Sequence, residues 1–259
     1  MELFFRKYGN GSLNIIILHG LYGSSDNWVS IAKILSQKFT VYIPDQRNHG
    51  QSPHSAEFNY NVLINDLYNF IVKNKIDNPV IIGHSMGGKV AMYFNYTYPQ
   101  ITKKLIIIDI VPKDYSNDQN NKFHRKLILF MSRLNLNNFK NRKDLSDFIF
   151  NKINDKRLTH FILKNLKRED NSFSWKINIE TISNELQNIL SEEYNKKIKN
   201  INTPTLFIKA EDSGYIKPQD FYFIKSIFKN VEIKSIKNTS HWIHSEKPAK
   251  LCELIFDFV

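Results

Sequence analysis

Ser85 lies in the run GHSMG, residues 83–87, after the apolar run NPVII and before the helix-like run GGKVAMYFNY. This is the GxSxG pattern, in which a tight turn from a strand into a helix holds a serine hydroxyl exposed above a sheet. The glycines suit such a turn because larger side chains there would collide with the neighbouring strand or helix. The motif and its context together predict that Ser85 is a nucleophile.

A nucleophilic serine needs a base, and His241 is the favoured candidate. It follows the last expected strand and precedes the last expected helix, in the run IKNTSHWIHSEKP, where an imidazole can reach the top of the sheet. His244 is the rival, but its place near a helix start favours a capping or solvent-facing role. We expect His84 to point away from the serine and His19 to brace loops.

Two aspartates could orient the imidazole. Asp109 ends the apolar run IIIDI, and Asp212 lies in the turn after the apolar run PTLFIKA. A carboxylate at the end of a buried strand costs several kcal/mol unless it is paired or hydrogen-bonded. The other roles open to them are a loop cap for Asp109 and a solvated turn for Asp212. We favour Asp109, because it follows the strand expected beside the nucleophile, and keep Asp212 as the alternative acid.

Short apolar runs alternate with stretches of helical period along the chain, which predicts an α/β fold. The runs FTVYIPD, NPVIIGHS, KKLIIIDI and TPTLFIKA are rich in Val, Ile and Leu throughout, as in parallel strands covered on both faces, and VEIKSIKN is a weaker last strand. ELFFRKY and NIIILHG, joined by GNGS, predict an edge hairpin. We expect a mostly parallel central sheet of seven or eight strands flanked by helices.

The alternation is interrupted between IIIDIVP and NTPTLFIKA, where helix-like segments occur without a strong strand. A structureless loop of this length is improbable in a compact domain. We therefore expect residues 113–200 to form a helical cap inserted into a core of residues 1–112 and 201–259. Ligands bind at the carboxyl ends of the strands in open α/β sheets, so the cap should lie there.

Composition argues against several other classes of protein. The formal net charge is +11, but residues 113–200 carry 18 Lys/Arg and 11 Asp/Glu, so most of the excess is regional. There is no aromatic RNA-binding pattern, zinc-finger spacing or long basic run, which argues against a nucleic-acid partner. No His or carboxylate pair has the spacing of a zinc helix. The sequence has no apolar run long enough to span a bilayer and no signal-peptide pattern, so we expect a cytoplasmic protein. We expect its single cysteine, Cys252, to fill the core.

The motifs as a set resemble the α/β-hydrolase superfamily, and within it the small cytoplasmic YbfF-type esterases and their mitochondrial relatives. The segments that carry the resemblance are LHGLYGSSDNW, PDQRNHGQSP, GHSMGGKVAM, IDIVPKDY and SHWIHSEKP. The resemblance implies a serine hydrolase that acts on small-molecule esters or acyl thioesters without a metal or organic cofactor. Many members place the acid in a GxxD pattern after the strand that reads PTLFIKA here, whereas this chain has Ser213 at the fourth position.

The fold that this resemblance implies also supplies an oxyanion hole, made by the backbone N–H groups of Leu21 and Met86. The loop DQRNHGQS is expected to support the strand end through Asp45 and Arg47. Carbon–carbon bond hydrolysis with the same triad, and a non-catalytic ligand-binding role, stay open as alternatives. The oligomeric state and the acyl length are not predicted. The side chains expected to line the substrate pocket are Tyr22, Trp175, Asn178 and Trp242.

Overall fold

The computed structural model describes the whole chain except residues 118, 171 and 192–197. Its central sheet has seven strands in the order β1-β3-β2-β4-β5-β8-β9, and within this sheet only the β1–β3 pair is antiparallel. The predicted α/β class and mostly parallel sheet are confirmed. The strands are β1 (Phe5–Tyr8), β2 (Asn14–Leu18), β3 (Thr40–Pro44), β4 (Val80–His84), β5 (Lys104–Ile108), β8 (Thr205–Ala210) and β9 (Val231–Ile236).

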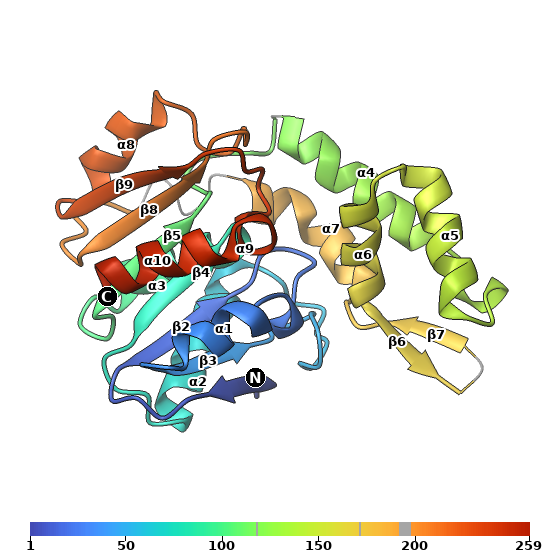
Figure 1. Ribbon diagram of the computed structural model, residues 1–259, viewed down its shortest axis with the longest axis horizontal. Coiled ribbons are helices and arrows are strands. Elements are labelled where there is room, and N and C mark those ends of the chain that lie inside the picture. The colour runs from blue at the N-terminus through green and yellow to red at the C-terminus, as the bar shows by residue number, and fades with distance from the viewer. Residues whose placement is uncertain (118, 171, 192–197) are drawn as a thin grey trace.

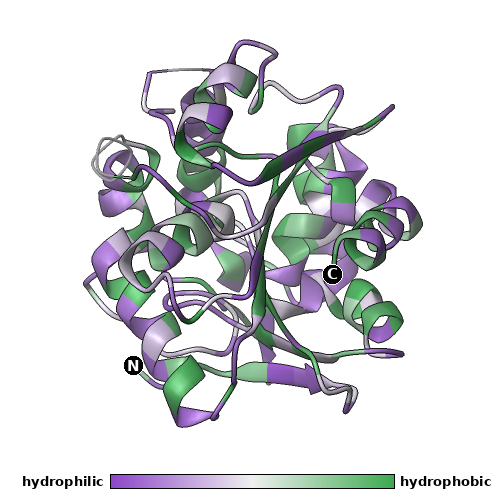
Figure 2. Ribbon diagram, turned by 90° about the vertical axis from the view of Figure 1, so that its left-hand side faces the viewer, coloured by the Kyte–Doolittle hydropathy of each residue, from purple (hydrophilic) through white to green (hydrophobic). Residues whose placement is uncertain are grey.

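Helices cover both faces of this sheet, and this explains why its inner strands are apolar throughout. Alternate residues of one strand enter different core clusters: Ile16 packs with α2 and α3 side chains, while Ile15 and Ile17 pack with those of α1 and α10. Figure 2 shows green strands running through the middle of the core with helices on either side. The covering helices are α1 (Val29–Leu35), α2 (Tyr60–Lys73), α3 (Met86–Thr97), α8 (Asp220–Ile227) and α10 (Pro248–Phe258).

The predicted N-terminal hairpin is wrong. Strand β1 does lie at the sheet edge, but it pairs with β3, from Phe5 opposite Pro44 to Tyr8 opposite Val41. The glycines that suggested a turn serve a close crossing instead. A Cβ on Gly9 would lie 2.2 Å from the carbonyl oxygen of Phe39, and Gly9 has a φ of +73°. The loop therefore passes directly over the start of β3 and lets β2 lie between β3 and β4.

Between β5 and β8 the chain leaves the sheet and forms a group of elements that lies to one side of it (Figure 1). Strands β6 and β7 form an antiparallel hairpin that the expectation of helices alone missed. Each is only four residues long, and three of the four residues of β6 are exposed, so neither gives a strand-like apolar pattern. The elements are α4 (Gln119–Arg133), α5 (Arg142–Ile153), α6 (Lys156–Lys164), β6 (Leu166–Glu169), β7 (Ser172–Trp175) and α7 (Ile179–Leu190).

We propose to treat residues 113–200 as one unit, called the cap below, and residues 1–112 with 201–259 as the core. The stretches 118, 171 and 192–197 fall within the cap and lie outside the described residues. The cap contacts the core through buried polar bonds as well as apolar packing. Asn165 donates to the backbone oxygen of Tyr22 over 2.9 Å, and Tyr60 donates to that of Ile189 over 2.9 Å. These bonds fix the cap against the loop after β2 and the start of α2.

Candidate active site

Ser85 lies at the turn between β4 and α3, with φ +53° and ψ −121°. Few non-glycine residues adopt a positive φ, and such strain persists only where the surroundings enforce it. The enforcement is visible at both glycines of the motif. A Cβ on Gly83 would lie 2.3 Å from the Gly87 oxygen, and one on Gly87 would lie 2.4 Å from the Leu18 oxygen. Close packing of β2, β4 and α3 thus requires both glycines and holds Ser85 at the rim of a cavity.

Asp109 and His241 form a hydrogen bond of 2.8 Å between Oδ2 and Nδ1. Asp109 follows β5 with a φ of +48°, and its side chain is fully buried. Its other oxygen, Oδ1, accepts the Ala210 N–H over 3.1 Å at the end of the neighbouring strand β8. Both carboxylate oxygens therefore have donors, which offsets the cost of burying the charge.

Asp212 has a different environment. Its side chain is exposed in the turn after β8, and only its backbone N–H is bonded, to the Thr239 oxygen over 2.9 Å. In the described part of the chain its carboxylate makes no hydrogen bond or ion pair. It does line the same cavity as Ser85 and His241, but the bond to the imidazole belongs to Asp109.

Ser85 and His241 both line the cavity, yet the Ser85 hydroxyl makes no hydrogen bond to any described residue. Such bonds are often long in unliganded sites and tighten when substrate is bound. The backbone N–H groups of Leu21 and Met86 likewise donate to none of the described residues. Met86 is the first residue of α3, so its N–H points out of the positive end of the helix. Leu21 lies in a turn closed by the Gly23 N–H, which donates to the Gly20 oxygen over 2.9 Å.

Several other histidines lie around the site, and burial keeps them neutral. His84 Nε2 lies 2.9 Å from the backbone oxygen of His241, so the residue before Ser85 helps to hold the loop that carries His241. His244 is buried and stacks on Trp28 with ring centroids 4.8 Å apart, so its predicted solvent-facing or capping role is wrong. Burial lowers the pKa of His19 to about 4 and that of His244 to about 3. His19 braces the loop after β3, since its Nε2 accepts the Gln46 N–H.

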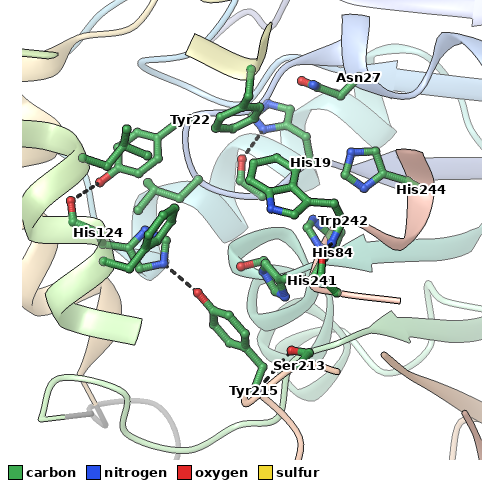
Figure 3. A pocket seen from close by; sticks show the side chains of 18 of the residues that line it. His19, Tyr22, Asn27, His84, His124, Ser213, Tyr215, His241, Trp242 and His244 are labelled. Carbon is green, nitrogen blue, oxygen red and sulfur yellow. Dashed lines mark hydrogen bonds between the residues drawn. The ribbon is translucent and has the colours of Figure 1, made fainter. Parts of the chain in front are cut away.

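Tyr215 is the main contact of His241 that the sequence did not predict. Its ring stacks on the His241 imidazole with centroids 3.8 Å apart and planes 14° apart. Its hydroxyl lies 2.9 Å from Nε2 of His124, which comes from cap helix α4 (Figure 3). The backbone oxygen of Tyr215 accepts the Tyr115 hydroxyl over 2.9 Å. Burial first, and then the nearby His241, lowers the pKa of His124 to about 3, so His124 meets the Tyr215 hydroxyl as a neutral imidazole.

The cavity has a volume of about 360 Å³, and aromatic and aliphatic side chains form much of its wall. Of the side chains expected to line the pocket, Tyr22 and Trp242 do so, and Trp175 and Asn178 do not. Asn178 instead caps helix α7 by accepting the Thr181 N–H over 3.2 Å, and Trp175 ends the β7 strand of the cap hairpin. Among the residues that the structure describes, no lysine or arginine lines the cavity, so its wall suits an uncharged acyl or alkyl group.

The loop DQRNHGQS supports the site from outside it. Arg47 forms a buried ion pair with Asp66 over 2.6 Å, and Asp45 accepts the Ser25 N–H over 2.6 Å. Within the described ranges, no group of three or more His, Cys, Asp or Glu side chains could hold a metal ion. In the same ranges no helix is long and apolar enough to cross a bilayer.

Comparison with known proteins agrees with the geometry. A family model of the alpha/beta hydrolase fold matches residues 14–248. The chain is 35% identical over 255 residues to the sn-1-specific diacylglycerol lipase ABHD11 of Danio rerio, covering 96% of this chain and 78% of the relative. It is 29% identical over 234 residues to esterase YbfF of Escherichia coli, covering 90% of this chain and 88% of the relative. A solved marine microorganism esterase superimposes with a TM-score of 0.93 at 40% identity, covering 100% of this chain and 99% of that one. The chain therefore belongs to the alpha/beta hydrolase fold family, within which it is similar to YbfF-type esterases.

Proposed function

We propose that this protein is a serine hydrolase of carboxylic esters. Ser85 is the nucleophile, His241 the general base and acid, and Asp109 the carboxylate that orients the imidazole. The observation that carries the proposal is the 2.8 Å bond between the buried Asp109 and His241, whose side chain lines the same cavity as the strained Ser85 turn. The names of the similar proteins, a lipase and two esterases, support the same reaction class.

In the proposed reaction the Ser85 oxygen attacks the carbonyl carbon of the ester, and His241 Nε2 takes the serine proton. The oxyanion that forms is stabilised by the N–H groups of Leu21 and Met86, which have no other acceptor among the described residues. Collapse breaks the bond to the leaving alcohol, which receives the proton from His241. Water then attacks the acyl-enzyme, again giving a proton to His241, and Ser85 recovers its proton as the carboxylic acid leaves.

Active-site labelling tests this proposal directly. Three serines line the cavity, namely Ser85, Ser213 and Ser240. Labelling with an alkyl phosphonate therefore shows which of the three is the reactive one. We expect one phosphonate per chain, attached to Ser85 on peptide mapping, and loss of ester turnover in step with labelling. Folded Ser85→Ala and His241→Ala variants should lose turnover alike, because the triad acts as a unit. Turnover by folded Ser85→Ala would refute the serine mechanism, and a wild type that neither labels nor hydrolyses esters would favour a ligand-binding role.

Acyl thioesters with a phosphorylated leaving group are a second candidate substrate class. A neighbouring hollow of about 530 Å³ shares Phe161 and Trp242 with the cavity and is also lined by Lys33 and Lys164. Neither lysine forms an ion pair with a residue outside the gaps at 118, 171 and 192–197. Arg157 lies there too but is paired with Glu246. An acyl group in the cavity would leave the phosphates of a coenzyme A ester near Lys33 and Lys164.

Turnover of matched substrates separates the two classes. For butyryl-coenzyme A, Lys164→Ala should lower kcat/KM by roughly fivefold, the effect expected for one partly solvated ion pair. The same variant should leave kcat/KM for a neutral butyryl ester unchanged. Equal effects on both substrates, or on neither, would remove the support for thioesters and leave the ester hydrolase proposal standing.

A further inference from the structure

Helix α4 of the cap lines two hollows. His124 and Leu127 in its first half line the active-site cavity, whereas Leu129 and Phe130 further along the helix line a groove of about 500 Å³. This outer groove is completed by the end of α4, the following turn and α5. Its lining residues are Lys126, Leu129, Phe130, Arg133, Leu134, Asn135, Asn138, Phe139, Phe148 and Lys152.

The outer groove combines exposed apolar surface with unneutralised positive charge. Leu129 is 48% exposed and Phe148 is 37% exposed, although both are large apolar side chains. Beside them lie Lys126, Arg133 and Lys152, and no carboxylate among the described residues lines the groove. None of the three cations forms an ion pair within the described part of the chain. The Lys152 ammonium lies 5.8 Å from the centre of the Phe148 ring, so its positive charge borders the apolar surface directly.

The spacing along α4 makes this surface continuous with the mouth of the active site. Phe123, Lys126, Phe130 and Arg133 follow one another at intervals of three, four and three residues, which places them on one side of a helix. Phe123 is 39% exposed and lines the active-site cavity. Any binding partner that covers the outer groove would therefore also lie beside the entrance of the active-site cavity.

We propose that the outer groove is a docking surface for an anionic lipid bilayer. Apolar side chains flanked by lysine and arginine suit the interface of such a bilayer, where the apolar groups enter the boundary of the acyl chains and the cations meet the headgroups. Charge complementarity selects an anionic surface over a neutral one. Docking would bring Phe123 and the entrance of the cavity to the lipid. The proposal concerns binding alone and does not depend on the ester hydrolase activity.

Vesicle co-sedimentation of the full chain tests the proposal. We expect binding to vesicles of phosphatidylcholine with one third phosphatidylglycerol and none to phosphatidylcholine alone. Lys126→Ser with Lys152→Ser should weaken partitioning by at least about tenfold, since each basic residue near an anionic surface contributes about fivefold. Leu129→Ser with Phe148→Ser should weaken it by about tenfold through lost apolar burial. Hydrolysis of a soluble short-chain ester should be unchanged in both double variants, which shows that they are folded.

Matched substitutions on the core distinguish a defined surface from general attraction of a basic protein. Lys225→Ser with Lys237→Ser removes the same charge, and Val72→Ser with Tyr222→Ser removes side chains that are 56% and 85% exposed. Both control pairs should bind within about twofold of the wild type. Equal weakening by the core and groove lysine pairs would overturn the proposal, as would unchanged binding of the Leu129 and Phe148 variant. Absence of binding to the anionic vesicles would overturn it outright.

Discussion

Asp109→Asn tests the proposed triad at the point where the sequence left two acids open. The Ala210 N–H donates to Asp109 Oδ1 over 3.1 Å, while Oδ2 faces His241 Nδ1 over 2.8 Å. An asparagine in the same place must keep its carbonyl oxygen toward Ala210, because a backbone N–H cannot donate to an NH₂ group. Its NH₂ group then faces Nδ1 and makes that nitrogen an acceptor. The imidazole proton moves to Nε2, and His241 can no longer accept the proton of Ser85.

The expected loss is large because the substitution imposes the wrong tautomer while keeping the geometry. The corresponding change in a well-studied serine protease lowers kcat by about 10,000-fold, and we expect about 1,000-fold to 10,000-fold here. That range corresponds to roughly 4 to 5.5 kcal/mol of transition-state stabilisation. Asp212→Asn is the matched control: its carboxylate is exposed and bonds to no described residue, so turnover should stay within about threefold of the wild type.

The assay is steady-state hydrolysis of p-nitrophenyl butyrate, with kcat and KM measured separately and folding checked by thermal unfolding. We expect kcat to fall for Asp109→Asn while KM changes little, because the substitution affects proton transfer rather than the cavity wall. A larger loss for Asp212→Asn would reassign the acid. A folded Asp109→Asn protein with more than about a tenth of wild-type kcat would refute the tautomer argument.

Three further results are expected. Tyr215→Leu should lower kcat about tenfold and Tyr215→Phe less, because phenylalanine keeps the ring stacked on His241 and loses the hydroxyl with its bond to His124; equal losses would contradict the role of stacking. Raising the ionic strength should lower kcat/KM for butyryl-coenzyme A and not for the neutral ester, and parallel responses would exclude steering by Lys33 and Lys164. The free energy of unfolding, from urea titrations, should fall as the pH drops below about 6.5, because the unfolded chain then binds protons that buried histidines exclude. Each such histidine contributes roughly 1.4 kcal/mol of this loss at pH 5.5, the decline ends near their folded pKa values, and a constant free energy between pH 7.5 and 5.5 would contradict it. Burial lowers the pKa of each of His19, His49, His84, His124 and His244.

The sequence predicts the Ser85 turn well because its causes are local. A strand, two glycines and a helix start lie within a few residues, and the collisions that require Gly83 and Gly87 come from elements that the same motif implies. The inner strands are equally well predicted from the sequence, because burial on both faces requires a continuous run of apolar residues. The pairing of the edge strand β1 cannot be predicted in this way, because its four residues suit pairing with either β2 or β3. The close contact of Gly9 with Phe39 exists only in the assembled sheet.

The acid and the contacts of the base depend on distant parts of the chain. Asp109 and His241 are 132 residues apart. Asp109 follows β5 and His241 follows β9, and the two strands are brought close because both pair with β8. His244 next to Trp28, and Tyr215 next to His124, are likewise pairs from separate elements. No sequence motif predicts these contacts. Ring stacking and burial require that two side chains meet in space, and they impose no fixed spacing between the residues along the chain. The departure from the GxxD pattern has a related reason: β5 and β8 are adjacent strands, so a carboxylate after either of them can lie near the same imidazole.

The contacts of His241 also show how the cap can influence the chemistry of a core site. Asp109 and His84 hold the imidazole and its backbone from the ends of β5 and β4, so these contacts are fixed by the sheet itself. Tyr215, which also belongs to the core, stacks on the imidazole, but its hydroxyl is hydrogen-bonded to His124 of α4. A displacement of α4 would break this bond and leave the carboxylate bond intact. Asp109 is placed by the sheet, whereas the ring that stacks on one face of His241 is bonded to the cap. In the proposed mechanism the core therefore determines which imidazole nitrogen accepts the serine proton, and the cap affects how firmly the imidazole is held.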